Sequence, residues 1–413
     1  MSLDGVRINQ DRLWRDLMDM AKIGATPKGG VARLALTELD RRARDLFVSW
    51  CREAGCELRV DRIGNIFARR AGLDVDRPPV MTGSHLDTQP LGGKFDGIYG
   101  VLAGLEIIRT LNEARIDTLA PIDVVVWTDE EGARFGGGTI GSSTFVGRYD
   151  VETGLGRRDN DGITVGEALA AIGYAGDAPV GGYPVEAFFE VHIEQGPILE
   201  REGVPIGVVL GAQGARYFRV VVDGEEGHAG TLPMELRHDA LLGAARMIDA
   251  LNGVAFRHAP HPVITVGQIQ VRPNSRNTIP GQAVFSIDSR HPDNRTLAAI
   301  ERDMRAACEE IARKAGLAVA IEPVSQRDSI AFDRDCAAAI TRAADALDLP
   351  WQEIYSGAGH DACNLSLVAP TGMIFVPCED GVSHNERENA RPEDIAAGCD
   401  VLLHAMVERA SIA

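Results

Sequence analysis

The sequence predicts an α/β protein whose larger domain has a mainly parallel sheet and is interrupted by a smaller α+β domain. In both terminal parts of the chain, apolar runs of strand length alternate with segments of helical periodicity. Strand, helix and strand in succession imply a right-handed crossover and parallel pairing. Between these parts the order changes to β-α-β-β-α-β, the ferredoxin-like unit. We therefore expect the larger domain over residues 1–212 and 330–413, and an inserted domain over 213–329.

The chain should begin with two helices and a hairpin. Residues 9–24 place apolar side chains on one helical face. Thr37 and Asp40 have the spacing of a capping box and open a second helix, which should end at Gly55. Short alternating segments on either side of residues 64–65 predict a hairpin.

Three largely apolar runs in the first part predict buried strands, and each run leads into polar side chains. A predicted helix over 97–115 joins the first two runs. Functional sites in open α/β sheets lie beyond the carboxyl ends of the strands, so we expect these side chains to lie close together. The runs and the side chains that follow them are 80–84 with His85, 122–127 with Glu130 and Glu131, and 187–191 with His192.

The remaining elements complete the two domains. Residues 150–183 should form a loop and a short helix. In the inserted domain we expect strands at 217–222, 263–271, 281–290 and 317–324 and helices at 237–252 and 296–315. In the C-terminal part we expect a helix at 335–347, a strand at 371–376 and a helix at 392–409.

Composition excludes several classes of protein. A chain of 413 residues is long enough for two domains. The formal net charge of −18 argues against nucleic-acid binding, which requires a basic face. No apolar run approaches the roughly 20 residues that span a bilayer, and no signal-peptide pattern is present. The seven cysteines are scattered and form no Cys-x-x-Cys, which favours a cytoplasmic protein without disulfides.

The strand ends and a Gly-rich loop supply ligands suited to a borderline cation such as zinc. One aspartate can bridge two ions that lie roughly 3.5–4 Å apart. We assign His85 and His192 to one ion, Glu131 and His384 to the other, and Asp96 to both.

Glu130 stays outside this ligand set. Adjacent glutamates are usually a solvated pair, but their position after a buried run favours a function. A turn can aim them differently, so that Glu131 binds metal and Glu130 takes a proton from metal-bound water. Asp87 is spaced to accept the other N–H of the His85 ring.

His360 is an alternative ligand on spacing alone. Asp361 can equally cap the helix that follows, which leaves His360 to pack or to orient a neighbour. His384 precedes Asn385 and Glu386 in a polar loop and is the favoured ligand. Residues 136–138 are three glycines, but no Gly-Lys-Ser/Thr follows, so a P-loop is rejected.

These motifs resemble the hydantoinase/carbamoylase amidase family, a branch of the dinuclear zinc aminopeptidase-like hydrolases. The resemblance covers essentially the whole chain, with the order and spacing of the motifs intact. His192 stands where the peptidase relatives carry a carboxylate, which matches the amidase branch. The segments are G-S-H-L-D-T, G-G-K-F-D-G, T-D-E-E-G-A-R-F, H-I-E-Q-G-P-I-L-E, G-H-A-G-T-L-P-M, N-T-I-P-G, D-S-R and S-H-N-E.

The resemblance implies a zinc aminopeptidase-like catalytic domain and an inserted lid or dimerisation domain that forms a homodimer. It implies two divalent ions per subunit, with zinc favoured over manganese, cobalt or nickel, and Glu130 as the base. The expected reaction is hydrolysis of N-carbamoyl-L-amino acids or N-carbamoyl-β-alanine to the amino acid, carbon dioxide and ammonia. Allantoate amidohydrolysis is the alternative; a metallo-aminopeptidase or an inactive binding protein is less favoured.

The resemblance also implies residues that bind the small ureido acid. His228 should donate to the scissile carbonyl oxygen and reach the site of the neighbouring subunit. Asn277 and Arg290 match positions that hold the substrate carboxylate, and a planar guanidinium suits that role. Gln195 matches a substrate-contacting position, and Gly359 belongs to a loop expected near the substrate.

Overall fold

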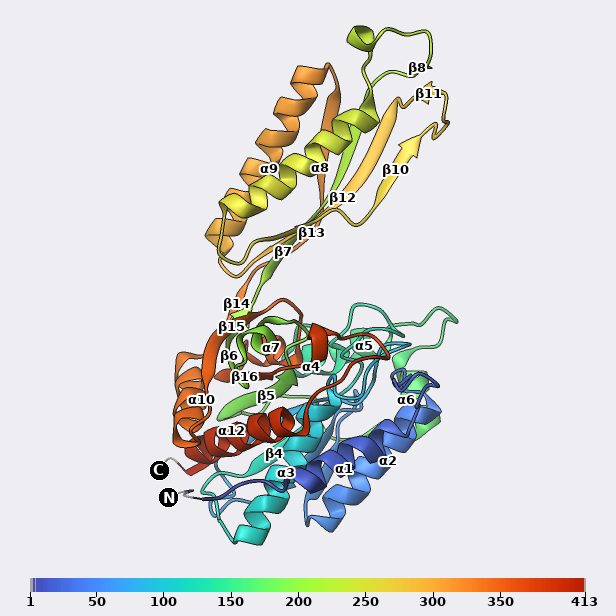
Figure 1. The fold of residues 1–413 in the computed structure, drawn as a ribbon. Coiled ribbons are helices and arrows are strands. Elements are labelled where there is room, and N and C mark those ends of the chain that lie inside the picture. The colour runs from blue at the N-terminus through green and yellow to red at the C-terminus, as the bar shows by residue number, and fades with distance from the viewer. Residues whose placement is uncertain (1–2, 4, 412–413) are drawn as a thin grey trace. The chain divides into compact units, whose positions relative to one another are not determined.

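The computed structural model describes residue 3 and residues 5–411, which form two compact units (Figure 1). Unit 1 contains the chain up to Leu210 and from Phe332 onward, and unit 2 contains Gly211–Ala331. Each unit has a hydrophobic core of its own. Among the described residues, no helix is both long and apolar enough to cross a membrane.

Unit 1 contains most of a nine-stranded sheet with the order β1-β2-β4-β3-β5-β16-β6-β14, in which β15 also pairs with β6. Only β14 and the last two residues of β6 fall within the residue range of unit 2. The four central strands, β4, β3, β5 and β16, are parallel, as predicted. Antiparallel strands extend the sheet on both sides, and β1 and β2 form the expected hairpin. The strands are β1 (Glu57–Val60), β2 (Ile66–Arg70), β3 (Val80–His85), β4 (Ile122–Trp127), β5 (Ala187–Ile193), β6 (Ile206–Ala212), β14 (Ile330–Ala331), β15 (Trp351–Ser356) and β16 (Thr371–Val376).

The helices expected in unit 1 are present, and several short helices that were not expected lie between them. Thr37 caps α2 as predicted. The Asp40 carboxylate accepts the N–H of Leu36 at 2.8 Å instead of that of Thr37, so the capping box is incomplete. The helices are α1 (Gln10–Ala21), α2 (Glu38–Glu53), α3 (Ile98–Ala114), α4 (Ile140–Phe145), α5 (Val151–Leu155), α6 (Val165–Ile172), α7 (Ile198–Glu202), α10 (Arg334–Ala346), α11 (Asp361–Leu365), η2 (Glu379–Gly381) and α12 (Pro392–Ser411).

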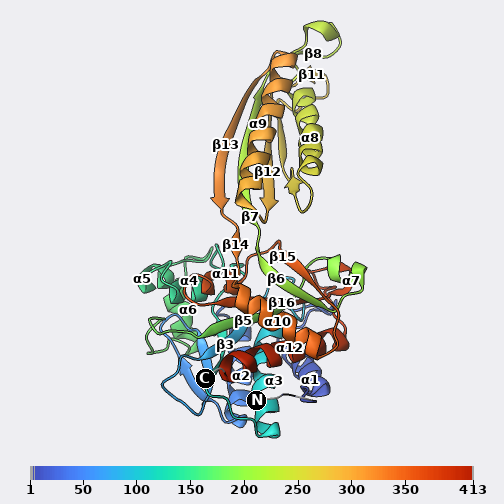
Figure 2. The ribbon, with the colours of Figure 1, turned by 90° about the vertical axis from the view of Figure 1, so that its left-hand side faces the viewer.

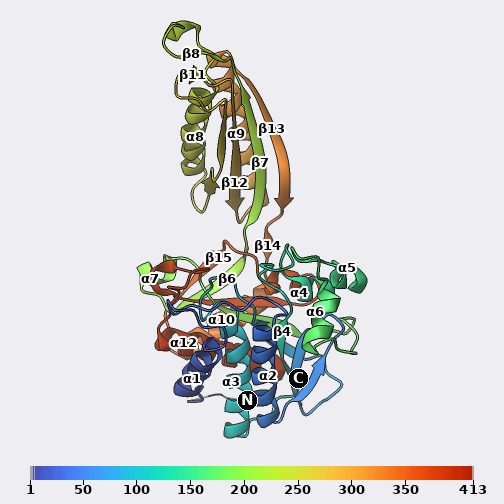
Figure 3. The same ribbon diagram turned by 90° about the vertical axis from the view of Figure 1, so that its right-hand side faces the viewer.

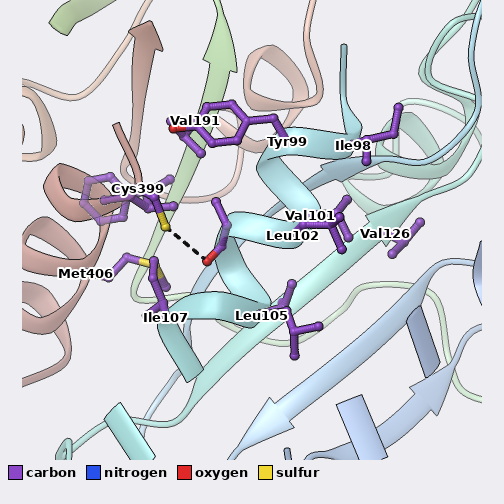
Figure 4. Packing of buried hydrophobic residues seen from close by; sticks show 14 of the residues in the cluster. Ile98, Tyr99, Val101, Leu102, Leu105, Ile107, Val126, Val191, Cys399 and Met406 are labelled. Carbon is purple, nitrogen blue, oxygen red and sulfur yellow. Dashed lines mark hydrogen bonds between the residues drawn. The ribbon is translucent and has the colours of Figure 1, made fainter. Parts of the chain in front are cut away.

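Helix α3 packs very closely against the parallel strands. Two glycines one turn apart permit this approach, because a Cβ at Gly100 would lie 2.8 Å from the carbonyl oxygen of Val191. A Cβ at Gly104 would lie 2.8 Å from the side chain of Val124. Figure 4 shows this core, in which the thiol of Cys399 on α12 donates to a main-chain carbonyl of α3 at 3.6 Å. The buried helix thus holds the central strands firmly in place.

Unit 2 has the expected β-α-β-β-α-β order in an antiparallel sheet, β10-β12-β7-β13. Alternate residues of β12 are buried, and α8 and α9 lie side by side against that face (Figures 2 and 3). A second, two-stranded sheet pairs β8 with β11. The elements are β7 (Gly214–Asp223), β8 (Gly227–His228), η1 (Met234–Leu236), α8 (Ala240–Arg257), β9 (Val263–Thr265), β10 (Ile269–Arg272), β11 (Thr278–Ile279), β12 (Gln282–His291), α9 (Asn294–Ala315) and β13 (Ala318–Arg327).

The strand predicted at 263–271 is divided into β9 and β10, which both pair with β12. The pairing is interrupted around Gly267. There, Gln268 and Ser286 exchange two hydrogen bonds, one of which goes to the hydroxyl of Ser286 at 3.2 Å instead of to a carbonyl. A glycine within a strand commonly marks such an irregularity.

Asp61, in the turn between β1 and β2, is a fully buried carboxyl group. Its oxygens accept the N–H groups of Ile63 and Asn65 at 3.1 and 2.9 Å, and the side-chain amide of Asn65 at 2.9 Å. Burial outweighs these bonds and raises the pKa of Asp61 to about 7.

We expect Asp61 to make the stability of unit 1 depend on pH. The folded protein keeps this proton up to about pH 7, whereas an unfolded chain releases it near pH 4. The folded state therefore binds more protons in this window, and the free energy of unfolding falls as pH rises, by at most about 1.4 kcal/mol per pH unit. The Asp61→Asn variant should be less stable than the wild type, and its free energy of unfolding should lack the pH dependence that Asp61 contributes.

The measurement is thermal unfolding of both proteins with a chelator present, at about pH 5 and about pH 8. The difference in Tm between the two conditions should be smaller for Asp61→Asn. An equal difference in both proteins would show that Asp61 is ionised in the folded state.

Candidate metal centre

The carboxyl ends of β3, β4 and β5 carry four of the side chains expected at the site. His85 is the last residue of β3, Glu130 and Glu131 follow β4 closely, and His192 is the penultimate residue of β5. Strand β3 pairs in parallel with both β4 and β5. The structure therefore brings these four side chains to one edge of the sheet.

The first group of ligand atoms comes from His85, Asp96 and His192, which are all buried. Asp96 Oδ1 lies 3.2 Å from Nε2 of His192 and 3.6 Å from Nε2 of His85. Burial alone would lower the pKa of His192, but the nearby Asp96 carboxylate raises it above its usual value. The three side chains attract a positive charge into the space between them.

The orientation of both imidazoles is set by main-chain carbonyls. Nδ1 of His85 donates to the carbonyl of Asp87 at 2.9 Å, and Nδ1 of His192 donates to that of Ile193 at 2.9 Å. A proton on Nδ1 leaves the Nε2 lone pair of each neutral ring directed at Asp96. The N–H of Gly97 also donates to Nε2 of His192, at 3.2 Å. Lone pairs that face a carboxylate favour a cation, either a proton or a metal ion, between them.

The second group of ligand atoms uses the other oxygen of Asp96. Oδ2 lies 3.4 Å from Nε2 of His384, which in turn lies 3.4 Å from Oε2 of Glu131. Both oxygens of Glu131 are held by Gln89, through its N–H at 3.1 Å and its side-chain amide at 2.8 Å. Asp96 is therefore common to both groups.

The spacing of these atoms fits divalent cations. Separations of 3.2–3.6 Å are longer than most charged hydrogen bonds. Two ligand atoms that bind one tetrahedral ion at about 2.1 Å lie roughly 3.4 Å apart. The residues can thus hold two ions, with Asp96 between them.

Glu130 lies beside the first group without belonging to either group. Its Oε2 is 3.5 Å from Nε2 of His85. Asp129 has a φ of 53°, and this turn after β4 aims Glu130 and Glu131 differently. Burial raises the pKa of Glu130 well above its usual value; His85 opposes this shift and Asp361 adds to it. Such a carboxylate has the properties of a general base.

The prediction that the Asp87 carboxylate binds the His85 ring is wrong. Its Oδ1 is 3.9 Å from Nδ1 of His85, and the main-chain carbonyl of Asp87 takes its place. The irregular segment that follows β3 brings that carbonyl within reach. Asp87 Oδ2 instead accepts the N–H of Glu131 at 3.3 Å and links the two loops.

His360 lies behind the site, with its ring centroid 4.8 Å from that of His192. Its Nε2 bonds Ser356 Oγ at 2.9 Å. Glu190 completes a third group with these two histidines, but both oxygens of Glu190 already accept hydrogen bonds from the protein. His360, not Asp361, occupies the N-cap position of α11. A structural role for His360 fits these contacts.

Glu388 and Gln195 hold Asp96 in place, and the sequence predicts this role for neither of them. Glu388 is buried and accepts the N–H groups of Phe95 and Asp96 at 2.8 and 3.2 Å. Nothing in the polar run after the S-H-N-E segment distinguishes it. Gln195, expected to contact substrate, donates its amide to Asp96 Oδ2 at 2.8 Å and to Ser383 at 3.1 Å.

The other expected substrate residues lie on exposed loops or in unit 2. Gly359 is exposed between β15 and α11. In unit 2, His228 on β8 pairs with Thr278 on β11, and the carbonyl of Asn277 accepts the N–H of Ala229 at 3.0 Å. His228 and Asn277 are therefore neighbours.

Arg290 lies far from both of them within unit 2. Asn277 precedes Gln282, the first residue of β12, whereas Arg290 is eight residues along that strand, or about 27 Å away. Its guanidinium binds the carboxylate of Asp288 at 2.7 Å and the hydroxyl of Tyr217 at 3.3 Å. Unit 2 thus does not bring its three expected substrate residues together.

Comparisons with known proteins identify the family of the chain. The model of peptidase family M20/M25/M40 matches residues 81–408. An N-carbamoyl-L-amino-acid amidohydrolase from Rhizobium meliloti is 46% identical over 98% of each chain. The allantoate amidohydrolase of Escherichia coli (strain K12) is 33% identical over 93% of this chain and 94% of its own.

Among solved structures, an amidase of the hydantoinase/carbamoylase family from Burkholderia multivorans is 55% identical. It superimposes with a TM-score of 0.96 and covers 98% of this chain and 99% of its own. The predicted resemblance is confirmed: the chain belongs to peptidase family M20/M25/M40, in the branch of the hydantoinase/carbamoylase amidases.

Proposed function

We propose that the protein is a metal-dependent amidohydrolase that removes the carbamoyl group of N-carbamoyl-L-amino acids or of N-carbamoyl-β-alanine. The observation that carries this proposal is one carboxylate, Asp96, shared by two groups of ligand atoms beside the unligated Glu130. The relative from Rhizobium meliloti, which shares almost the full length, supports this choice of substrate. Allantoate amidohydrolysis is the second candidate, because a relative with that activity also matches almost the whole chain.

Two divalent ions per subunit complete the proposed site. His85, His192 and Asp96 would hold one ion, and Asp96, Glu131 and His384 the other. Imidazole and carboxylate ligands favour zinc, with manganese, cobalt and nickel as alternatives. When bound, such ions acidify water and polarise the carbonyl oxygen of the substrate. The seven free cysteines are compatible with the cytoplasm, where we place the enzyme.

Glu130 moves the protons of the reaction. It takes a proton from the water that attacks the ureido carbon and returns it to the leaving nitrogen when the C–N bond breaks. The carbamic acid left by this cleavage breaks down to carbon dioxide and the second amine, so water and an N-carbamoyl amino acid give the amino acid, carbon dioxide and ammonia.

The residues of unit 2 recognise the substrate, and they must come from two copies of the chain. His228 donates to the carbonyl oxygen, and Asn277 and Arg290 bind the carboxylate. An N-carbamoyl amino acid is about two residues long, roughly 7 Å. It cannot touch both ends of β12, which lie about 27 Å apart. We therefore propose a homodimer formed through unit 2, in which His228 and Asn277 serve the site of the other subunit.

The substrate class is tested with a panel of compounds, by ammonia release from the ureido acids and by release of free amino acids from a dipeptide. Purified, metal-loaded enzyme is offered N-carbamoyl-L-α-amino acids, N-carbamoyl-β-alanine, allantoate and a dipeptide. We expect kcat/KM for a carbamoyl amino acid to exceed that for allantoate at least tenfold, roughly 1.4 kcal/mol of discrimination. The reverse order would identify an allantoate amidohydrolase. Preferred cleavage of the dipeptide would indicate an aminopeptidase. If no compound is turned over with zinc, manganese or cobalt present, the result would indicate a binding protein.

Replacing the proposed base should abolish turnover without loss of metal. Glu130→Gln keeps the size of the side chain but cannot accept the proton, so kcat should fall about 10²–10⁴-fold. Metal analysis should still find the wild-type metal content, because Glu130 is in neither ligand group. His238→Gln, at an exposed histidine of unit 2, is the matched control and should be fully active. Near-normal turnover by Glu130→Gln would refute the assignment.

The shared site is tested by mixing two inactive variants. A heterodimer of Glu130→Gln and His228→Asn subunits has one site in which both residues are intact. With random exchange of subunits, the mixture should recover about a quarter of wild-type activity. Each variant alone should stay inactive. No recovery, although heterodimers form, would place His228 in the site of its own subunit or outside catalysis.

A further inference from the structure

Arg237 holds the loop that carries His228 in unit 2. Its Nη2 donates to the carbonyl of Ala229 at 2.7 Å and to that of Leu232 at 2.9 Å, and its Nε donates to Leu232 at 3.0 Å. Among residue 3 and residues 5–411, no carboxylate lies within ion-pair distance of this guanidinium. The charge is therefore directed at loop carbonyls, and charged donors form the stronger hydrogen bonds.

The loop from His228 to Leu232 is a tight turn. The N–H groups of Thr231 and Leu232 point back at the carbonyl of His228, at 3.3 and 3.2 Å. The Leu232 side chain covers Gly227, where an added Cβ would come within 3.0 Å of it. The tip of the turn is exposed, but these contacts hold its backbone.

This turn decides which ring nitrogen of His228 carries the proton. The N–H of Gly230 donates to Nδ1 of His228 at 3.0 Å. An Nδ1 that accepts a hydrogen bond puts the proton of the neutral ring on Nε2. The exposed edge of the ring is then a donor, as the proposed contact with a carbonyl oxygen requires. The opposite tautomer would present a lone pair to that oxygen.

We infer that Arg237 is a positioning residue that fixes the His228 turn so that Nε2–H is presented to the substrate carbonyl. The inference rests on the proposed function of His228. By fixing the carbonyls on both sides of Gly230, Arg237 keeps the Gly230 N–H directed at Nδ1. Arg237 itself touches no reacting atom.

The kinetic test is a double-mutant cycle in the metal-loaded enzyme. One oxyanion donor contributes about 10²–10³-fold to kcat. We expect Arg237→Gln to lose roughly tenfold or more of kcat with little change in KM, and Arg237→Lys, which has one donor centre, to recover part of it. In a His228→Asn background, Arg237→Gln should cost nothing further. Equal losses in both backgrounds would overturn the inference.

Arg305→Gln is the matched control. Arg305 also lies in unit 2 and donates to a main-chain carbonyl, that of Ile321 at 3.0 Å, but it has no contact with the His228 turn. Its replacement should leave kcat unchanged even where it lowers Tm. A kcat loss equal to that of Arg237→Gln would show a general effect of destabilising unit 2, which contradicts a specific role.

A spectroscopic test does not depend on activity. Protein labelled with ¹⁵N-histidine is examined by NMR at about pH 8.5, where ordinary imidazoles are neutral. The resonances missing from His228→Asn assign His228. In the wild type, His228 should show the Nε2–H tautomer alone. In Arg237→Gln, His228 should show a mixture of both tautomers. An unchanged tautomer in Arg237→Gln would overturn the inference. Normal turnover by His228→Asn would refute only the proposed role of His228, so the two failures are distinguishable.

Discussion

The metal centre depends on one buried carboxylate that faces three imidazoles. Burial alone would raise the pKa of Asp96, but His192, His384 and His85 together hold it well below its usual range. The same attraction raises the pKa of His384 above its usual value. Protons and divalent cations therefore compete for the same nitrogen atoms, and metal binding must release protons. The charge on Asp96 determines the affinity of both groups.

The precision of this arrangement comes from two different sources. His85 and His192 end adjacent parallel strands, whose register is fixed by backbone pairing and by the close approach of α3. Asp96 lies in a loop, and Glu388 fixes that loop by accepting two consecutive N–H groups. Gly93 is required there, because a Cβ would lie 2.0 Å from the Glu388 carboxylate. A loop residue can thus be as well positioned as a strand residue when a buried carboxylate binds its backbone.

The sequence predicts those side chains of the site that lie at or just after the ends of strands. Apolar runs identify β3, β4 and β5, and the polar side chains after them do converge. It does not predict the contacts that arise only after folding. Glu388 occupies a polar run without periodicity, and at His85 the main-chain carbonyl of Asp87 takes the place expected for its carboxylate. The division of the strand at 263–271 depends likewise on a single pairing irregularity at Gly267, which hydrophobicity alone does not reveal.

Unit 2 imposes a different constraint, that of length. Its strands β7, β12 and β13 each have ten residues, well above the average strand of five to six. Arg290 and the His228 turn lie at opposite ends of this sheet, so its length sets their separation. Removal of two residues from β12 would shorten that separation by about 7 Å, the size of the proposed substrate. For the proposed site built from two copies of the chain, we expect substitutions on the open face of the sheet to be tolerated and a change in strand length not to be. The tip must then be rigid as well as distant, and the inferred role of Arg237 adds to the support that the pairing of β8 with β11 gives this turn.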